Sequence, residues 1–229
     1  RDNTLYFYDL NAKINHRIND RNRIFLSGYF GRDIFSNDFA RMSLGNQTGT
    51  FRWNHLFSQK IFSNFTVIHS MYDYQLGTPE GNANSFLWKS KMQNQSVKGD
   101  FTWYADPQNT VRFGAAAIVH TFDPGIAKGT GDESLFTEYK LPLNYAIEYG
   151  VYLSNEQKIN DKLLIKYGLR FSAFQNIGSA TIYNFDEEYN VIDSTTYGKR
   201  EIFNTWHALE PRLGANYMIS TTQSIKASY

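Results

Sequence analysis

The chain has 229 residues, a net charge of +1 and no cysteine. Its length allows one large domain or two small ones. The lack of cysteine excludes disulfides, thiolate metal sites and cysteine nucleophiles. Lysine and arginine are scattered instead of forming a basic stripe, so the charge pattern implies no nucleic-acid partner.

Aromatic residues make up 17% of the chain, with 16 Tyr and 18 Phe. No run of 18 consecutive apolar residues occurs, so the sequence predicts no transmembrane helix. The mean hydropathy of −0.49 is that of an ordinary soluble protein. Transmembrane β-barrels share such values, because only alternate residues of their strands face lipid. Composition therefore leaves a membrane barrel open.

Apolar and polar residues alternate over most of the chain, which predicts β-strands with one apolar face. The first strand is expected over 6–18, where Tyr6, Leu10 and Ile14 share a face. Further strands are expected near 24–30, 51–58, 65–74, 111–119, 145–153, 163–173 and 213–219. Between 74 and 111, one more strand is expected to end near Trp103. A short last strand is expected over 224–229.

The predicted connections alternate in length. Tight turns are expected near Asn19, Gln59, Pro107, Asn160 and Thr221. Loops are expected over 36–47, 77–84, 123–139 and 177–205. Outer-membrane barrels combine short periplasmic turns with longer extracellular loops, so this alternation places the turns in the periplasm and the loops outside.

These patterns predict an all-β fold, a transmembrane antiparallel β-barrel. The last strand has only about six residues, which span roughly 20 Å. A tilted strand needs about 9–11 residues to cross a bilayer, so this strand is too short to cross. We therefore expect residues 1–229 to be a partial outer-membrane barrel of about nine to ten strands, with its plug domain and remaining strands outside this chain. The alternative is a ten-stranded barrel with a truncated last strand.

Two segments resemble the barrel of TonB-dependent outer-membrane receptors, in particular those common in Bacteroidota. One runs from Ala208 through Glu210-Pro211-Arg212 to Tyr217 and is followed by the strand Ser224-Ile225-Lys226-Ala227-Ser228-Tyr229. The other is Phe51-Arg52-Trp53-Asn54-His55-Leu56-Phe57-Ser58. The family's barrels have about 22 strands and a plugged lumen.

The resemblance implies a receptor that takes up a nutrient across the bacterial outer membrane in an energy-coupled way. Its implied partners are outer-membrane lipid, the receptor's own plug domain, the TonB complex and an unspecified nutrient ligand. A surface lipoprotein or another outer-membrane protein is a further candidate partner. The alternatives are a structural or secretion-associated barrel and a passive porin.

No catalytic, cofactor-binding or metal site is expected, and the protein is not expected to be an enzyme. The histidines are His16, His55, His69, His120 and His207, and none has the spacing that metal chemistry favours. Asp186, Glu187, Glu188 and Asp193 could hold Ca²⁺ but are expected to be a solvated loop. Gly125, Gly129, Gly131 and Asp132 are expected to provide loop flexibility rather than a phosphate cradle.

A set of charged residues alternates with the apolar ones and is expected to line the barrel interior. Its members are Lys13, Arg17, Arg52, Lys98, Glu148, Lys166, Arg170 and Arg212. They are expected to form a hydrated inner wall with cross-strand ion pairs, or to contact the plug domain or the substrate. Pro142 and Pro211 are expected early in their strands, where a missing N–H is tolerated.

Overall fold

The computed structural model describes residues 3–80, 83–132 and 134–229. In these ranges the chain forms strands, turns and irregular connections without a helix. No described segment is therefore a helix that could cross a membrane. The all-β class is confirmed.

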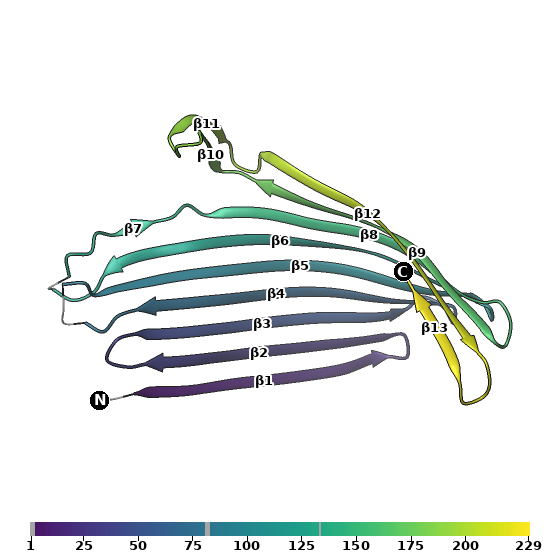
Figure 1. Cartoon of the computed structure of the whole chain (residues 1–229). Helices are drawn as coiled ribbons and strands as arrows, with labels where there is room; N and C mark the ends of the chain where they lie inside the picture. The colour runs from purple at the N-terminus through teal and green to yellow at the C-terminus, as the bar shows by residue number, and fades with distance from the viewer. Residues whose placement is uncertain (1–2, 81–82, 133) are drawn as a thin grey trace.

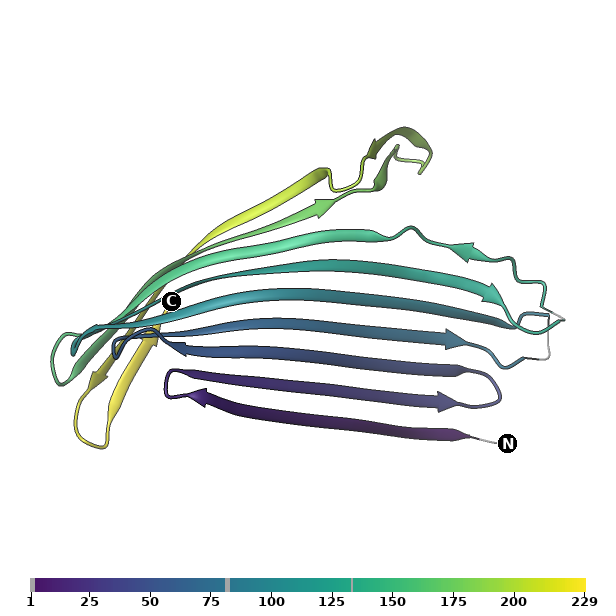
Figure 2. The ribbon, with the colours of Figure 1, turned by 180° about the vertical axis from the view of Figure 1, so that it is seen from behind.

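Ten strands lie side by side in one curved antiparallel sheet, in the same order as in the sequence (Figure 1). They are β1 (Thr4–Asn19), β2 (Asn22–Ser36), β3 (Arg41–Leu56), β4 (Ile61–Gly77), β5 (Phe86–Asp106), β6 (Asn109–Gly129), β8 (Asn144–Lys158), β9 (Leu163–Ile177), β12 (Ile202–Met218) and β13 (Ser224–Ser228). The two-residue β7 (Tyr139–Lys140) pairs with β6. β10 (Ala180–Phe185) and β11 (Val191–Tyr197) form a separate hairpin that stands off the sheet (Figure 2).

Nine of these described strands have 15 to 21 residues, whereas β13 has five. This confirms the expected nine long strands and one short one. The long strands exceed the 9–11 residues that a tilted strand needs to cross a bilayer. Each can therefore project beyond a hydrocarbon layer, and β5 and β6, with 21 residues each, can project furthest.

Side-chain amides and carboxylates close several of the tight turns. The Oδ1 atoms of Asn19 and Asn160 accept hydrogen bonds from backbone N–H groups two or three residues later. Asp106 accepts bonds from the backbone of Gln108 and Asn109. Asn and Asp favour turns because their side chains can mimic a backbone turn in this way. The five predicted tight turns are confirmed, and the Gln59 turn ends where β4 begins.

Several predicted loops are shorter in the structure. The prediction of a loop over 36–47 is wrong, because β2 continues to Ser36 and β3 starts at Arg41. Residues 123–129 extend β6, and residues 202–205 open β12. These segments lack a consistent apolar face, but backbone hydrogen bonds to the neighbouring strands do not depend on one. Of the loop expected over 77–84, Gly81 and Asn82 lie outside the described residues.

The loop expected over 177–205 is not structureless either. It holds the β10–β11 hairpin, in which Thr181 pairs with Thr196 and Asn184 with Asp193. The contrast between short turns and long loops therefore remains at the 78–85, 130–143 and 178–201 connections and is lost at 37–40.

Pro211 lies in the middle of β12, opposite Leu169 of β9, so its expected position early in a strand is wrong. Leu213 exchanges backbone hydrogen bonds with Tyr229, on the β13 side. Alternate residues of an antiparallel strand direct their bonds to the same side. The missing N–H of Pro211 therefore faces the β13 side, and no hydrogen bond to β9 is lost. Pro142 precedes β8 by two residues.

The pairing register sorts the side chains onto two faces. The face that we call apolar holds a row of register partners that crosses eight strands. Its members are Ile14, Leu26, Phe51, Val67, Val97, Ala117, Tyr149 and Ala173. The polar face is the other one and carries Lys13, Lys98 and Arg170.

An aromatic cluster lies on the apolar face near the tight-turn end. The rings of Trp53 and Phe65, Phe65 and Phe101, and Phe101 and Phe113 have centroids 5.4, 5.5 and 5.0 Å apart. Phe57 stacks on Phe101 at 6.2 Å. Transmembrane barrels carry aromatic girdles at the edges of their apolar bands, and this cluster has the corresponding position.

The apolar face is not covered by other parts of the described chain. Among the described apolar residues only Ala146 and Ala173 are buried, whereas the exposed fractions of Leu10, Leu153 and Leu213 are 67%, 58% and 57%. Contiguous exposed apolar surfaces mark contact with a membrane or a partner. The sheet has the architecture of a wall with one apolar side rather than that of a domain with its own core.

Candidate functional site

All eight residues expected to line an interior lie on the polar face. When paired residues are followed from strand to strand across the sheet, Arg17 of β1 lies in the same row as Arg170 of β9. In the same way, Arg52 of β3 lies in one row with Thr66 of β4 and Lys98 of β5. The remaining members occupy rows of the same parity. They are Lys13, Glu148, Lys166 and Arg212. The prediction that they share one face is confirmed.

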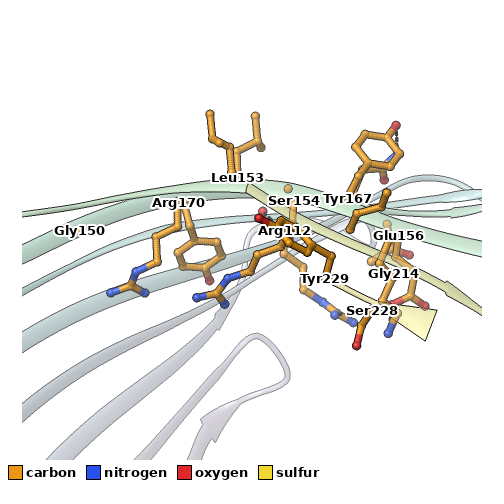
Figure 3. A pocket seen from close by; sticks show the side chains of 18 of the residues that line it. Arg112, Gly150, Leu153, Ser154, Glu156, Tyr167, Arg170, Gly214, Ser228 and Tyr229 are labelled. Carbon is orange, nitrogen blue, oxygen red and sulfur yellow. Dashed lines mark hydrogen bonds and ion pairs between the residues drawn. The ribbon is translucent and has the colours of Figure 1, made fainter. Parts of the chain in front are cut away.

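The polar face is concave. Lys98 of β5 and Ser228 of β13 line the same hollow of about 560 Å³, although four strands separate them in the sheet. Small residues from the intervening strands form much of its floor, including Ala116, Gly150 and Gly214. Figure 3 shows Arg112 and Arg170 on the hollow side of the sheet, whereas Leu153 and Tyr167 project from the other side. The charged side chains are thus gathered on the inside of the curve.

Asp100 joins β5 to β8 at one side of this hollow. Its Oδ2 lies 3.0 Å from Nζ of Lys98 on the same strand. Its Oδ1 accepts a 2.6 Å hydrogen bond from the hydroxyl of Tyr152. Between them, β6 contributes only Gly114, the register partner of both residues. The bond therefore bridges two strands that are not neighbours.

Glu156 joins three strands closer to the turn end. Its Oε2 lies 2.8 Å from Nζ of Lys166 on β9 and 3.8 Å from an Arg112 nitrogen on β6. All three side chains line the hollow. One carboxylate thereby balances two cations, and the group keeps a surplus of positive charge.

Glu210 has the same role between β9 and β12. Its Oε1 accepts a 2.6 Å hydrogen bond from Ser172, and its Oε2 lies 3.0 Å from an Arg212 nitrogen. Arg170 donates to the Ser172 hydroxyl at 2.9 Å and lies 3.8 Å from Glu210. Exposed ion pairs contribute little stability singly, and more when they form a network with hydrogen bonds. The network fixes the orientation of the two guanidinium groups that border the hollow.

The cations of the first three strands are placed differently. Lys13, Arg23 and Arg52 form no ion pair with any described residue. Arg23 lies directly opposite Arg17 in the register, and Arg17 is paired with Asp20 at the turn. On the polar face, the expected cross-strand ion pairs are therefore present from β6 to β12, whereas Lys13, Arg23 and Arg52 of β1 to β3 have no described acidic partner.

The five histidines do not gather into one site. His16, His55, His69 and His207 lie in β1, β3, β4 and β12 on the apolar face, whereas His120 lies on the polar face of β6. His120 is hydrogen-bonded to Asn94 at 2.8 Å, and its Nε2 lies 3.8 Å from Glu148. Within the described ranges, no group of three or more His, Asp or Glu residues has a metal-binding arrangement.

The acidic loop residues take part in turns. Asp186, at the end of β10, accepts hydrogen bonds from the backbone N–H groups of Glu188 and Asn190 and from the Asn190 side chain. Asp193 accepts a bond from the backbone of Ser194. These bonds lower the pKa of Asp186, the largest cause being the backbone N–H of Asn190. Asp186 therefore holds the hairpin tip, and within the described ranges the acids form no metal-binding group.

Of the glycine-rich segment, Gly125 and Gly129 lie within β6, and Gly131 follows it. Gly125 and Gly131 have positive φ angles of 121° and 79°. At Gly125 the pairing between β5 and β6 shifts by one residue, which is a β-bulge. The segment thus shapes the end of a strand, and no helix follows it among the described residues.

Six residues of the polar network are not among the residues predicted to line the interior. They are Asp100, Arg112, Tyr152, Glu156, Ser172 and Glu210. The sequence contains a signal for five of them, because all but Arg112 are an even number of residues from a predicted interior residue of the same strand. Their pairing could not be predicted, since it depends on which strands neighbour one another and in which register.

Comparisons with known proteins identify the fold. No protein-family model matches the chain, and no curated protein matches it. Solved structures do match. The copper transporter OprC superposes with a TM-score of 0.71 at 10% identity, over 97% of this chain and 37% of OprC.

Two further structures give the same result. BauA, the ferric preacinetobactin receptor from Acinetobacter baumannii, matches with a TM-score of 0.68 at 12% identity, over 97% of this chain and 39% of BauA. FrpB, an iron transporter from Neisseria meningitidis, matches with a TM-score of 0.68 at 13% identity, over 98% of this chain and 37% of FrpB. These neighbours are TonB-dependent outer-membrane receptors.

The chain spans less than two fifths of the length of these receptors, with 37%, 39% and 37% of each covered. At this identity the likeness shows the fold. The chain has the fold of a section of the wall of a large receptor barrel, as expected. The neighbours are transport receptors rather than enzymes.

Proposed function

We propose that this chain forms part of the barrel of a TonB-dependent receptor that takes up a scarce nutrient across the bacterial outer membrane. The observation that carries the proposal is the two-sided curved sheet, which superposes on receptor barrels over 97% or 98% of its length. The expected membership of the Bacteroidota group of these receptors is part of the proposal and rests on the sequence resemblance.

The two faces support a position in the membrane. Lipid would cover the exposed apolar face, where an ionised group is costly. The concave polar face would line a hydrated lumen. A transmembrane barrel must pair every backbone group in the hydrocarbon region, and the long strands β2 to β9 are paired on both sides.

The connections support an orientation. Long extracellular loops and short periplasmic turns are the rule in bacterial barrels. We therefore place the β10–β11 hairpin and the 130–143 connection outside, and the turns at Asn19, Asp106 and Asn160 in the periplasm.

The polar network supports contact with a plug. A plug domain and further strands, both outside this chain, would complete the receptor. Cations such as Arg52 and Lys13, which have no described acidic partner, suit a polar or acidic surface inside the lumen. A TonB complex in the inner membrane would supply the energy through that plug, and a surface lipoprotein or other outer-membrane protein remains a candidate partner outside.

An epistasis experiment tests the function. The gene would be deleted in its host and in a strain that lacks TonB, and fitness would be measured on a panel of single limiting nutrients. We expect a defect on at least one nutrient in the parent and no additional defect in the strain lacking TonB. An additional defect would favour a passive porin, and a general envelope defect on all nutrients would favour a structural or secretion-associated barrel.

A labelling experiment tests the placement separately. These 229 residues contain no cysteine, so a cysteine substitution adds the first thiol to this section, and the full-length protein without that substitution serves as the labelling background in intact cells. We expect a membrane-impermeant maleimide to label Glu187→Cys in the hairpin and not Asp161→Cys in a turn. The reverse pattern would contradict the orientation.

A further inference from the structure

A cluster of cations lies on the apolar side of the sheet, beyond the apolar band. On β5, the apolar side chains Val97 and Trp103 give way toward the loop end to Gln95, Gln93, Lys91 and Lys89, all on the same face. Register partners on the neighbouring strands follow the same change. Arg32 aligns with Gly45, Asp73 and Lys91, and Lys128 aligns with Leu87. The change marks the level at which the outward face turns from apolar to charged.

These side chains border one hollow of about 590 Å³. Its lining includes Arg32, Lys89, Lys91 and Lys128 together with apolar Met71, Leu87 and Ile126. Cations beside apolar groups suit the boundary between a headgroup and an acyl chain, because lysine can lay its aliphatic stem along apolar surface while its ammonium stays in a polar layer.

The arginine in this hollow already has partners, whereas the lysines do not. Arg32 lies 2.8 Å from Asp73 and donates to the Ser43 hydroxyl at 2.9 Å. Lys89, Lys91 and Lys128 are exposed and form no ion pair with any described residue. Three ammonium groups are therefore free to bind an anion.

Acidic side chains are also present and must be counted. Asp73, Asp123 and Glu138 line the hollow with the four cations, which leaves one surplus positive charge. Arg41 and Lys140 add two more on the same face, since they align in the register with Lys128 and Ile126. The whole chain has a net charge of only +1. The surplus is thus a local concentration of positive charge at one level of the outward face.

We propose that this hollow binds the phosphate-bearing headgroup of a lipid in the outer leaflet. The inference rests on the proposed placement of the sheet in a membrane, in which this level coincides with the headgroup layer. Basic pockets at that depth bind anionic headgroups. The occupant is therefore a membrane lipid with at least one phosphate group and a net negative charge, held by Lys89, Lys91 and Lys128.

Native mass spectrometry of the full-length protein tests the proposal. The protein would be titrated with phosphatidic acid and with phosphatidylcholine of the same acyl chains. We expect phosphatidic acid to be retained preferentially. The triple variant K89Q/K91Q/K128Q should weaken its binding by at least about tenfold, given that each lysine near an anionic lipid surface contributes about a factor of five.

A matched control removes the same charge at the opposite end of the sheet. Lys60, Lys158 and Lys162 are exposed lysines at the tight turns, and K60Q/K158Q/K162Q should bind phosphatidic acid like the wild type. Equal losses in both triple variants, or no loss in K89Q/K91Q/K128Q, would overturn the proposal. Displacement of the lipid by millimolar inorganic phosphate would also overturn it, because the site would then hold a free anion.

The cysteine-labelling pattern distinguishes this failure from failure of the membrane placement. If Glu187→Cys is labelled from outside and lipid binding is still unaffected by K89Q/K91Q/K128Q, the headgroup site alone is wrong. If the labelling pattern is reversed, the placement itself is wrong.

Discussion

The hydroxyl of Tyr152 on β8 donates a 2.6 Å hydrogen bond to Asp100 on β5, although β6 lies between the two strands. The bond is possible because β6 presents Gly114 at this point. A Cβ atom on Gly114 would lie 2.5 Å from the backbone oxygen of Gly99 and 2.8 Å from the Tyr152 ring. The concave face thus ties alternate strands together over a position without a side chain.

We predict that Gly114→Leu breaks this bond, because the new side chain must displace the Tyr152 ring. Loss of a hydrogen bond to a charged group lowers the free energy of unfolding by about 1.5–3 kcal/mol. Tyr152→Phe should lose about this amount, and Gly114→Leu should lose more, because its side chain also clashes with the backbone oxygen of Gly99. Urea unfolding of the full-length protein in vesicles would measure both. Gly49→Leu is the control, since nothing lies within 4 Å of a Cβ there, and an equal loss in that variant would contradict the explanation.

A charge on the apolar face should be far more damaging than one on the polar face. Val151, 53% exposed on β8, would face lipid, whereas Ser154 lines the hollow on the other face. An arginine facing lipid near the bilayer midplane costs about 2–4 kcal/mol. We therefore expect Val151→Arg to lower the urea midpoint of the vesicle-inserted protein strongly. Ser154→Arg should change this midpoint little. Equal shifts would refute the assignment of the faces.

Glu210 should stabilise the β9–β12 pair mainly through Ser172 and Arg212. We expect Glu210→Gln and Ser172→Ala each to lower the unfolding midpoint, and the double variant to lower it by less than the sum of the two. Interacting groups show such coupling in a double-mutant cycle. Additive effects would mean that the 2.6 Å hydrogen bond between these residues contributes nothing to stability.

The β10–β11 hairpin should respond to acid through Asp186. The backbone N–H of Asn190 and the other hydrogen bonds at the tip hold the pKa of Asp186 below its ordinary value. Because the folded-state pKa is lowered, the stabilisation is fully present above about pH 3.9 and is lost as the pH falls through the folded-state pKa.

Hydrogen exchange over residues 180–197 would test this. At pH 7 we expect Asp186→Ala to exchange faster than the wild type, because the hairpin tip has lost its acceptor. At a pH below the folded-state pKa the two proteins should exchange alike. A difference that persists in acid would show that the carboxylate charge is not the cause. Glu187→Gln serves as the control, because the neighbouring Glu187 carboxylate accepts no hydrogen bond from the described residues.

The alternation of residues such as Tyr6, Leu10 and Ile14 determined the number of long strands and the face on which each side chain lies. Side-chain direction in a strand has a period of two, so it can be derived from the sequence alone. Asn19 and Asn160 marked their turns for a similarly local reason, because an Asx side chain bonds to the backbone two or three residues later. The same chemistry occurs at Asn37, whose Oδ1 accepts bonds from Phe39 and Ala40 and closes the short 37–40 connection.

Only the tertiary structure decided how far the strands extend and which side chains meet. β5 continues to Phe86 without an apolar face, because the backbone of β4 holds it in place through Gly77. Tyr152 reaches Asp100, and Lys89 and Lys128 reach one hollow, because strand register and sheet curvature bring together residues far apart in the sequence. Register is a property of pairs of strands, whereas periodicity is a property of one.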